Sequence, residues 1–432
     1  MNKSIYRGAS VSLALAAALM FAGAAGAQTP PAAAPAASAP TSAPTANAPA
    51  PEATTLAAQV SHAWAETAQS LVVGALMTKA PKLDDPKTVK LLGDRGPALY
   101  EAVREATLEA WTESKPRVES ILTHAMAEQF SLEELRAGAA FAQGPDEAYA
   151  LEIFRFETAE PGKQEALSKP AAAALARLEA TEAGRKFLQD ATAKDGLVKQ
   201  RQPDLIAAIL PPWLLRFSDK LEAVEAARGS LPAPDAYAPS ADDQALGVSI
   251  VHSFYGLMDD STWDKVMPAA VAAMNRKMAE RQNVKMPRPE WNGFLAAAIV
   301  ETLRDDKPTV ELAFGRALAR IYDHDDLKAL ADFTNGPGMG YLKRSGAERK
   351  AGEPAPAQSP DEKAAMATLA KHDLAVKAIG QMANLASTDP EKKERLMALF
   401  IDMGVTLGPK MARRFALKAE ALETQTRAAR GW

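Results

Sequence analysis

The sequence predicts an all-α protein made of two tandem helical-bundle domains that arose by internal duplication. Three observations support this prediction: apolar residues recur at spacings of three and four, strict alternation of apolar and polar residues is hard to find, and one set of motifs occurs twice. The hydrophobic share of 47% is rich in alanine, whereas aromatic residues make up only 6%. Alanine is the best helix former, while aromatic and β-branched residues favour strands.

The first residues have the three-part layout of a secretory signal peptide. Lys3 and Arg7 precede an apolar run that begins near Ala9, and small residues follow up to Ala27. We expect cleavage after Ala27, which removes residues 1–27 and leaves the mature protein in the periplasm or outside the cell. An uncleaved signal that anchors the protein in the membrane is the alternative. No later stretch reaches about 18 uninterrupted apolar residues, so no transmembrane segment is expected after cleavage.

Proline-rich stretches divide the remainder of the chain. Residues 28–55 are almost entirely Pro, Ala, Ser and Thr, with too little bulky apolar surface to offset the entropy of ordering, so we expect a disordered linker. A second break at residues 229–240 separates two predicted domains, residues 56–228 and 241–432. A third proline-containing stretch, residues 345–360, is expected to form a loop inside the second domain.

The duplication is visible as a direct alignment of the chain with itself. At a shift of 192 residues, residues 115–145 align with residues 307–337, and 12 of the 31 positions are identical. Further matches between residues 216–223 and 414–421 need a shift of 198, and the six extra residues fit in the loop at 345–360. A repeat of this length predicts two copies of one structural unit.

The repeated segments carry the signals that start a helix. Ser131 is followed three positions later by Glu134, the spacing of a capping box, in which each side chain accepts a hydrogen bond from the backbone of the other residue. Asp323 and Asp326 hold the matching positions in the second segment. The flanking apolar pairs have the spacing of a hydrophobic staple and are Phe130 with Leu135, and Tyr322 with Leu327.

The same segments carry signals that end a helix. Gly144 and Gly336 are predicted to stop the two helices in a left-handed turn, and the proline that follows each glycine prevents continuation. The glycines in residues 336–340 superficially resemble a phosphate-binding loop, but such loops follow a strand and open a helix. We therefore predict a turn there.

The acidic stretch DHDD, residues 323–326, is the strongest candidate for a metal site. Metal binding requires Asp323, His324 and either Asp325 or Asp326 to converge on one ion, whereas neighbours in the first turn of a helix point in different directions. The matching segment, residues 131–134, has no histidine. Helix capping is the preferred interpretation, and no residue is assigned to a metal site.

Motifs for catalysis are weak in this sequence. No histidine lies four residues from another, as a zinc-binding H-E-x-x-H motif requires, and no G-x-S-x-G motif occurs. Cysteine is absent, which excludes disulfides and thiolate chemistry. His124 and His252 lie among apolar residues and are interpreted as packed or partly exposed helix residues. A Ser-His-Asp site assembled from distant positions stays open, but no catalytic or cofactor-binding residue is assigned and no cofactor is expected.

The C-terminal segment from Lys410 is rich in cations. These are Arg413, Arg414, Lys418, Arg427 and Arg430. The segment either contacts an anionic membrane or a partner, or packs as a helix whose cations favour its C-terminal end. Because Phe415 matches Phe217 in the first half, packing is the preferred interpretation.

Tryptophans are expected to anchor the core or a groove. Those considered are Trp64, Trp111, Trp213, Trp263 and Trp291. Trp213 follows two prolines, so an exposed contact is the alternative for that residue.

Phe130–Pro145 reads F-S-x-E-E-L-x-x-x-A-x-F-x-x-G-P, and with its second copy it resembles the signature of an exported bacterial family, domain of unknown function 2059. Leu178–Phe187 resembles the end of that signature. The chain departs from it at Gly144, where the family usually has serine, and at Ala142, where it usually has tyrosine. The resemblance implies two tandem copies, export and an all-helical fold. It implies no activity and no site residues.

The leading functional hypothesis is a non-enzymatic periplasmic protein that binds or scaffolds an envelope protein, a peptide or a lipid. Its basis is that packing motifs are duplicated while no reactive group is. The alternative is an envelope hydrolase whose site forms only in three dimensions. With a net charge of −4, the chain lacks the excess of cations that nucleic-acid binding needs. The sequence leaves the oligomeric state open.

Overall fold

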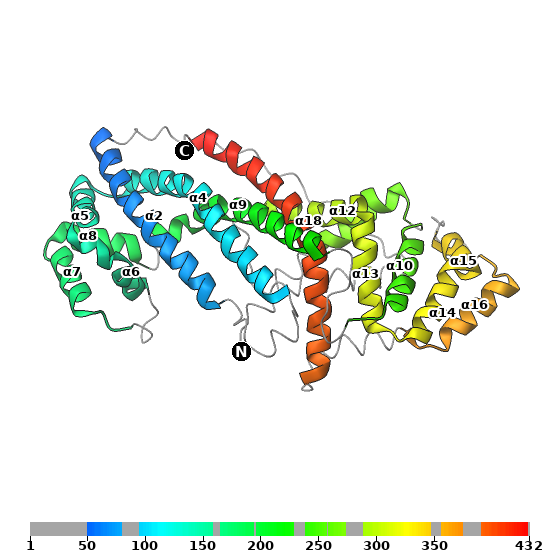
Figure 1. Ribbon diagram of the computed structural model, residues 1–432. Helices are drawn as coiled ribbons and strands as arrows, with labels where there is room; N and C mark the ends of the chain where they lie inside the picture. The colour runs from blue at the N-terminus through cyan, green and yellow to red at the C-terminus, as the bar shows by residue number, and fades with distance from the viewer. Residues whose placement is uncertain are drawn as a thin grey trace.

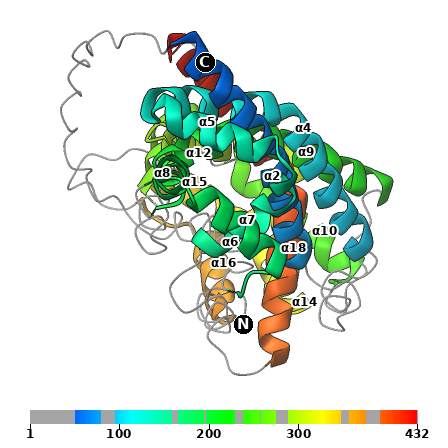
Figure 2. The ribbon, with the colours of Figure 1, turned by 90° about the vertical axis from the view of Figure 1, so that its left-hand side faces the viewer.

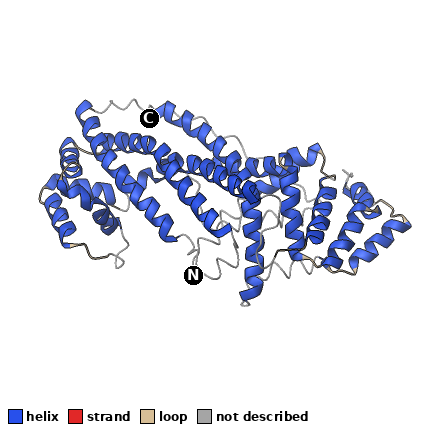
Figure 3. Ribbon diagram, in the orientation of Figure 1, coloured by secondary structure: helices blue, strands red, loops and turns tan. Residues whose placement is uncertain are grey.

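The computed structural model describes residues 50–79, 95–158, 165–193, 196–228, 238–256, 258–273, 288–346, 356–374 and 390–430. The described part of the chain is helical and contains no strand (Figure 3), so the all-α prediction is confirmed. The signal peptide predicted at residues 1–27 lies outside the described residues.

Both halves of the chain combine long and short helices and end in a long one. The first half contains α2 (Pro51–Lys79), α4 (Arg95–Gln129), α5 (Leu132–Ala142), the 3₁₀ helix η1 (Pro145–Tyr149), α6 (Ala150–Thr158), α7 (Lys169–Glu179), α8 (Glu182–Thr192) and α9 (Leu197–Arg228). The second half contains α10 (Ala241–Tyr255), the π-helical turn η2 (Thr262–Val266), α12 (Trp291–Asp305), α13 (Lys307–Ile321), α14 (His324–Asn335), α15 (Pro337–Gly346), α16 (Pro360–Ala370) and α18 (Pro390–Arg430).

The described helices form an elongated molecule with a small helical lobe at each end (Figure 1). One lobe contains α5–α8, which face the viewer in Figure 2, and the other contains α14–α16. Between the lobes, α9 packs against both α4 and α18. Helix α18 therefore belongs to the second half along the chain but covers part of the first half in space. No helix in the described part is both long and apolar enough to cross a membrane.

Helix α2 begins within the predicted linker. The linker was expected to extend to residue 55, whereas α2 starts at Pro51. Proline is well suited to the first turn of a helix, and the Thr55 hydroxyl donates to the Pro51 carbonyl at 3.0 Å. Ala53 is buried in the first-half core, and Glu52 forms an ion pair with Arg136 at 2.6 Å. These tertiary contacts order residues whose composition alone favours disorder.

The predicted helix starts are confirmed. The Ser131 hydroxyl accepts a hydrogen bond from the Glu134 backbone N–H at 3.3 Å, and the Glu134 carboxylate accepts one from the Ser131 N–H at 2.8 Å. The Asp323 carboxylate accepts a hydrogen bond from the Asp326 N–H at 2.9 Å. Each staple pair lies within one apolar cluster: Phe130 with Leu135, and Tyr322 with Leu327.

The predicted left-handed helix ends are wrong. Gly144 has φ −90° and ψ 175°, and Gly336 has φ −113° and ψ −161°, so both are extended. The proline after each glycine explains this, because its ring pushes the preceding residue towards extended conformations. Glycine is needed for space instead, since a Cβ would lie 2.9 Å from the Ala140 carbonyl oxygen or 2.6 Å from that of Asp332. Pro337 then opens α15, so residues 337–340 form a first helical turn and not the predicted turn.

The same contacts between helices form in both halves. Three pairs in the first half are His62–Glu119, Arg216–Glu113 and Lys220–Glu109, and the corresponding pairs in the second half are His252–Glu311, Arg414–Asp305 and Lys418–Glu301. For the last two pairs, the basic partners are related by 198 residues and the acidic partners by 192, the two shifts found in the sequence alignment. The helix starts of α7 and α16 also match, with caps at Ser168 and Ser359.

The two predicted domains share an apolar cluster. Ala207 of α9 is buried together with Trp291 of α12 and Phe415 of α18. The rings of Trp291 and Phe415 lie 5.4 Å apart in an edge-to-face arrangement, which is favourable for aromatic pairs. Hydrophobic burial thus joins the halves directly along α9 and α18.

Candidate functional site

A groove runs between α2 and the end of α5, where η1 begins. It has a volume of about 1200 Å³ and is open to solvent. Its lining residues are Pro51, Thr54, Thr55, Ala58, Gln59, His62, Ala63, Ala142, Gln143 and Glu147. Most of them come from α2 at helical spacings, so they share one face of that helix. A neighbouring face, which includes Ala57 and Val60, is buried in the core.

Most side chains that line the groove are able to form hydrogen bonds, and none is an activated nucleophile. The hydroxyls of Thr54 and Thr55 donate to backbone carbonyls of their own helix. The carboxamides of Gln59 and Gln143 and the Glu147 carboxylate form no hydrogen bond or ion pair with any described residue. An amide offers both donors and acceptors, so the groove presents unused polar groups between alanine methyls.

The second half fills the corresponding position with its own side chains. His252 of α10 and His62 of α2 make the same contact, which aligns Ser249 and Ser253 with Gln59 and Ala63. Asn335, at the end of α14, aligns with Gln143 in the sequence repeat.

These second-half side chains bond to one another across the two helices. The Asn335 amide nitrogen donates to the Ser249 hydroxyl at 2.9 Å. The Ser253 hydroxyl donates to the Asn335 amide oxygen at 2.6 Å. The two halves therefore differ at this site. Side-chain hydrogen bonds of Asn335 bridge α10 and α14, whereas a groove lies between α2 and α5.

The side chains of the DHDD stretch contact different partners. Asp323 caps α14, His324 Nδ1 lies 2.8 Å from an oxygen of Asp243, and Asp326 lies 2.9 Å from Nδ1 of His372. Within the described ranges, no group of three His, Cys, Asp or Glu side chains is placed to hold a metal ion. The capping interpretation is confirmed by the Asp323 contact.

Substitution of Asp323 separates capping from metal binding. Asp323→Ala is expected to destabilise the protein by about 1 kcal/mol, because it removes a helix cap. Asp323→Asn should remain within a few tenths of a kcal/mol of wild type, since asparagine caps equally well but is a poorer metal ligand. Thermal unfolding with and without a chelator provides the measurement. Equal losses for both variants, together with chelator sensitivity of the wild type, would contradict the prediction.

Asp243 gives the start of α10 a pH-dependent stability. The Ser240 hydroxyl, which donates to it at 2.7 Å, and His324 hold the pKa of the carboxyl below its usual value. A lowered folded pKa contributes stability that is present above the unfolded value, about 3.9, and is lost as the pH falls through the folded pKa.

We therefore expect Asp243→Asn to lower the Tm near neutral pH. The difference from wild type should shrink below about pH 4, where the unfolded carboxyl becomes protonated. Thermal melts across this range test the expectation. A Tm difference that is the same at every pH would contradict it.

Histidines in the described part serve contacts between and within helices. His62, His252, His324 and His372 each place Nδ1 within 2.9 Å of a carboxylate oxygen. No serine or threonine hydroxyl is bonded to any of these four rings. His124 Nδ1 lies 2.8 Å from the Ser120 carbonyl oxygen of its own helix. His62, His252, His324 and His372 are therefore not part of a nucleophile–base–acid arrangement of the kind that hydrolysis requires.

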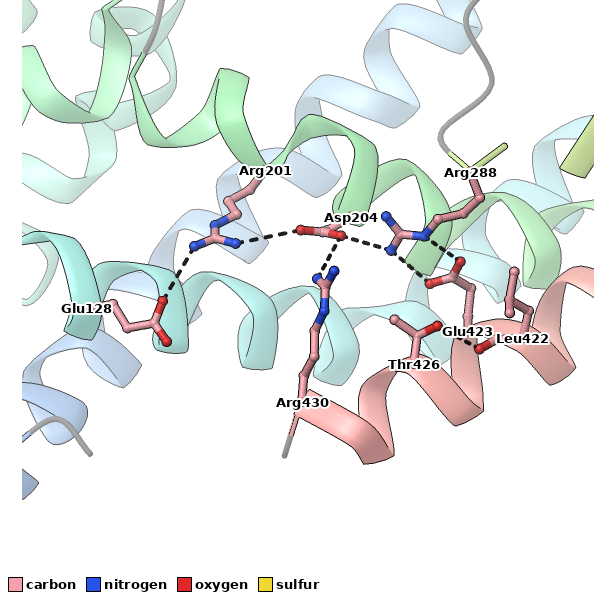
Figure 4. Close-up of polar contacts among 8 residues, drawn as sticks. All are labelled: Glu128, Arg201, Asp204, Arg288, Leu422, Glu423, Thr426 and Arg430. Carbon is pink, nitrogen blue, oxygen red and sulfur yellow. Dashed lines mark hydrogen bonds and ion pairs between the residues drawn. The ribbon is translucent and has the colours of Figure 1, made fainter. Parts of the chain in front are cut away.

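A network of charged side chains lies where α4, α9 and α18 meet (Figure 4). Arg288 donates from Nε and Nη2 to the two carboxylate oxygens of Glu423 at 2.9 and 3.0 Å, and Nη2 also donates to Asp204 at 2.8 Å. Asp204 also contacts Arg430 at 3.3 Å and Arg201 at 3.8 Å. Burial disfavours the charge of Arg288, but the hydrogen bonds with Glu423 and Asp204 outweigh it and raise the pKa of the guanidinium. No sequence motif predicts this network.

The cations of the C-terminal segment are engaged within the molecule. Their partners are Asp219 and Glu222 for Arg413, Asp305 and Asp306 for Arg414, Glu301 for Lys418, Glu420 for Arg427, and Asp204 for Arg430. The packing interpretation of this helix is therefore confirmed.

The tryptophans act as anchors, as expected. Trp111, Trp263 and Trp291 are buried, and Trp64 packs against Phe187 at 6.0 Å between ring centres. Trp213 donates its indole N–H to the Thr107 hydroxyl at 3.1 Å and stacks on Phe217. Trp213 is half-buried, and these two contacts favour the anchor interpretation over an exposed contact.

The chain matches no protein-family model, no curated protein and no solved structure. The resemblance to domain of unknown function 2059 stays a prediction from the two repeated motifs.

Proposed function

We propose that the protein is an exported, non-enzymatic binding or scaffolding protein of the cell envelope. The observation that carries this proposal is the groove beside α2, which combines unused amide groups with methyl surface and has no activated nucleophile. Binding sites of this kind fix the orientation of a ligand through a few polar groups.

The proposal includes an internal duplication into two copies of one helical unit. Matched ion pairs between equivalent helices support it, because their spacing follows the shifts seen in the sequence. One copy keeps its bridge between α10 and α14, while the other carries a groove at the same position. Such divergence after duplication frees one copy for binding while the other serves packing.

Export is proposed from the layout of residues 1–27, and the resemblance to an exported family supports it. An envelope hydrolase is the less favoured function, because no serine or threonine hydroxyl of a described residue is bonded to His62 and the nearby threonine hydroxyls donate to backbone carbonyls.

In-cell crosslinking tests the proposed function. A photo-crosslinking residue is placed at exposed positions on different parts of the surface, Gln143, Lys186 and Lys371, with the buried Ala57 as a control. We expect at least one exposed position to capture the same partner in repeated experiments, and mass spectrometry to find a mature chain that begins at Gln28. No reproducible partner at any exposed position, or a retained residue 1–27 segment in a cytoplasmic fraction, would overturn the proposal.

A further inference from the structure

We infer that the groove beside α2 binds an extended peptide segment of a partner protein that is rich in hydroxyl and amide side chains and carries a lysine or arginine. The inference rests on the proposed function and adds the chemical class of the ligand. Its starting point is the difference between the open groove and the bridged position in the second half.

The bridge in the second half shows which chemistry this position accommodates. There a carboxamide, Asn335, lies between two hydroxyls, Ser249 and Ser253. In the first half, the carboxamides of Gln59 and Gln143 lie at the same place, and neither makes a hydrogen bond with the described residues. Serine, threonine, asparagine and glutamine side chains of a ligand, like its peptide groups, can hydrogen-bond to these two carboxamides. They would replace the hydroxyl–carboxamide bonds that the second half makes internally.

The dimensions of the groove fit a short extended segment. Its lining on α2 runs from Pro51 to Ala63, which corresponds to roughly 18 Å along a helix axis. An extended chain advances about 3.3 Å per residue, so five or six residues span that length.

The charge of the groove selects a cationic segment. Glu147 is the only residue in the lining with a fixed formal charge, and its carboxylate has no ion pair among the described residues. Complementary charge across an interface raises specificity and the association rate. A lysine or arginine of the partner is therefore expected near η1.

The lining disfavours other ligand classes. It has no large aliphatic side chain to bury a lipid chain, because its apolar groups are alanine methyls and one proline ring. It has no phenylalanine, tyrosine or tryptophan, the residues on which the apolar face of a sugar ring packs. A peptide makes use of the amides without needing either.

A variant that copies the second half tests the inference. Gln59→Ser, Ala63→Ser and Gln143→Asn together supply the side chains of Ser249, Ser253 and Asn335, so they should close the groove and maintain the Tm. Ala58→Arg is a second variant, because residue 58 is exposed and a long side chain there fills the groove and can reach Glu147.

The probe is a phage-displayed library of random dodecapeptides, selected on the purified wild-type protein. We expect enriched peptides that combine Ser, Thr, Asn or Gln with Lys or Arg. They should bind at least tenfold more weakly to the triple variant and to Ala58→Arg, and several-fold more weakly to Glu147→Gln. No enrichment, or equal binding to wild type and to whichever groove variant folds, would overturn the inference.

The outcomes also separate this inference from the proposed function. A partner captured only through Lys186 or Lys371, with no peptide selected by the groove, contradicts the inference and leaves the proposed function standing. If the wild type binds a glycan array, the groove variants do not, and no peptide is enriched, the ligand is a carbohydrate and the inference is wrong. Absence of any crosslinked partner removes the proposed function itself.

Discussion

Glu423→Ala is expected to lower the Tm by on the order of 10 °C. The Glu423 side chain is only 4% exposed and holds the guanidinium of Arg288, which is 15% exposed, through both carboxylate oxygens. Removing one partner of a buried ion pair typically costs about 3–5 kcal/mol, because the remaining charge loses its compensation but stays away from water. Asp204 compensates only part of that charge, since it is shared with Arg430 and Arg201.

Calorimetry of three variants tests this expectation. The double variant Arg288→Met and Glu423→Leu should recover much of the loss, because it removes both charges and keeps the volume apolar. Asp264→Ala serves as the control for an exposed pair: Asp264 is 61% exposed and contacts Arg304, so its loss should cost less than about 1 kcal/mol. Equal Tm values for the Glu423→Ala and Asp264→Ala proteins would show that the network adds little stability.

Gly247→Ala is expected to destabilise the protein by roughly 2 kcal/mol or more. Helices α10 and α13 approach closely here: a Cβ on Gly247 would lie 2.2 Å from the Gly315 carbonyl oxygen, and one on Gly315 would lie 2.6 Å from the Val248 nitrogen. Both obstacles are backbone atoms, so the helices must separate. Separation loosens the neighbouring core at Ile250, and the higher helix propensity of alanine, about 1 kcal/mol, offsets only part of this cost.

Gly293→Ala is the matched control. A Cβ at Gly293 of α12 meets no atom within 4 Å, so the same exchange should leave the Tm unchanged or raise it slightly. Thermal unfolding of the two variants under identical conditions gives the comparison. Equal Tm values for Gly247→Ala and Gly293→Ala would mean that the close crossing of α10 and α13 does not limit packing.

The candidate groove was not predictable from local sequence signals. Gln59 and Gln143 are ordinary polar residues on helices, and composition placed the start of α2 inside a disordered linker. One signal could have found the site: with His62 aligned to His252, Gln59 matches Ser249 and Ala63 matches Ser253. The meaning of that difference depends on Asn335, which lies 82 residues beyond Ser253.

The helix ends show a second limit. The proline after Gly144 and after Gly336 favours an extended conformation at each glycine, whereas the common glycine cap favours a left-handed turn. Here the deciding interaction is local, between a proline ring and the residue before it. At a glycine that precedes proline, the steric effect of the proline ring outweighs the tendency of glycine to end a helix in a left-handed turn.

The sequence by itself determined the all-helical class and the capped starts of α5 and α14. Those features depend on hydrogen bonds and steric contacts within about four residues, so their signals are written locally. The tertiary structure decided the open groove beside α2, the order of residues 51–55 and the charged network around Arg288. Each of these depends on how closely separate helices approach, and that distance is set by side chains from several distant segments packing at once.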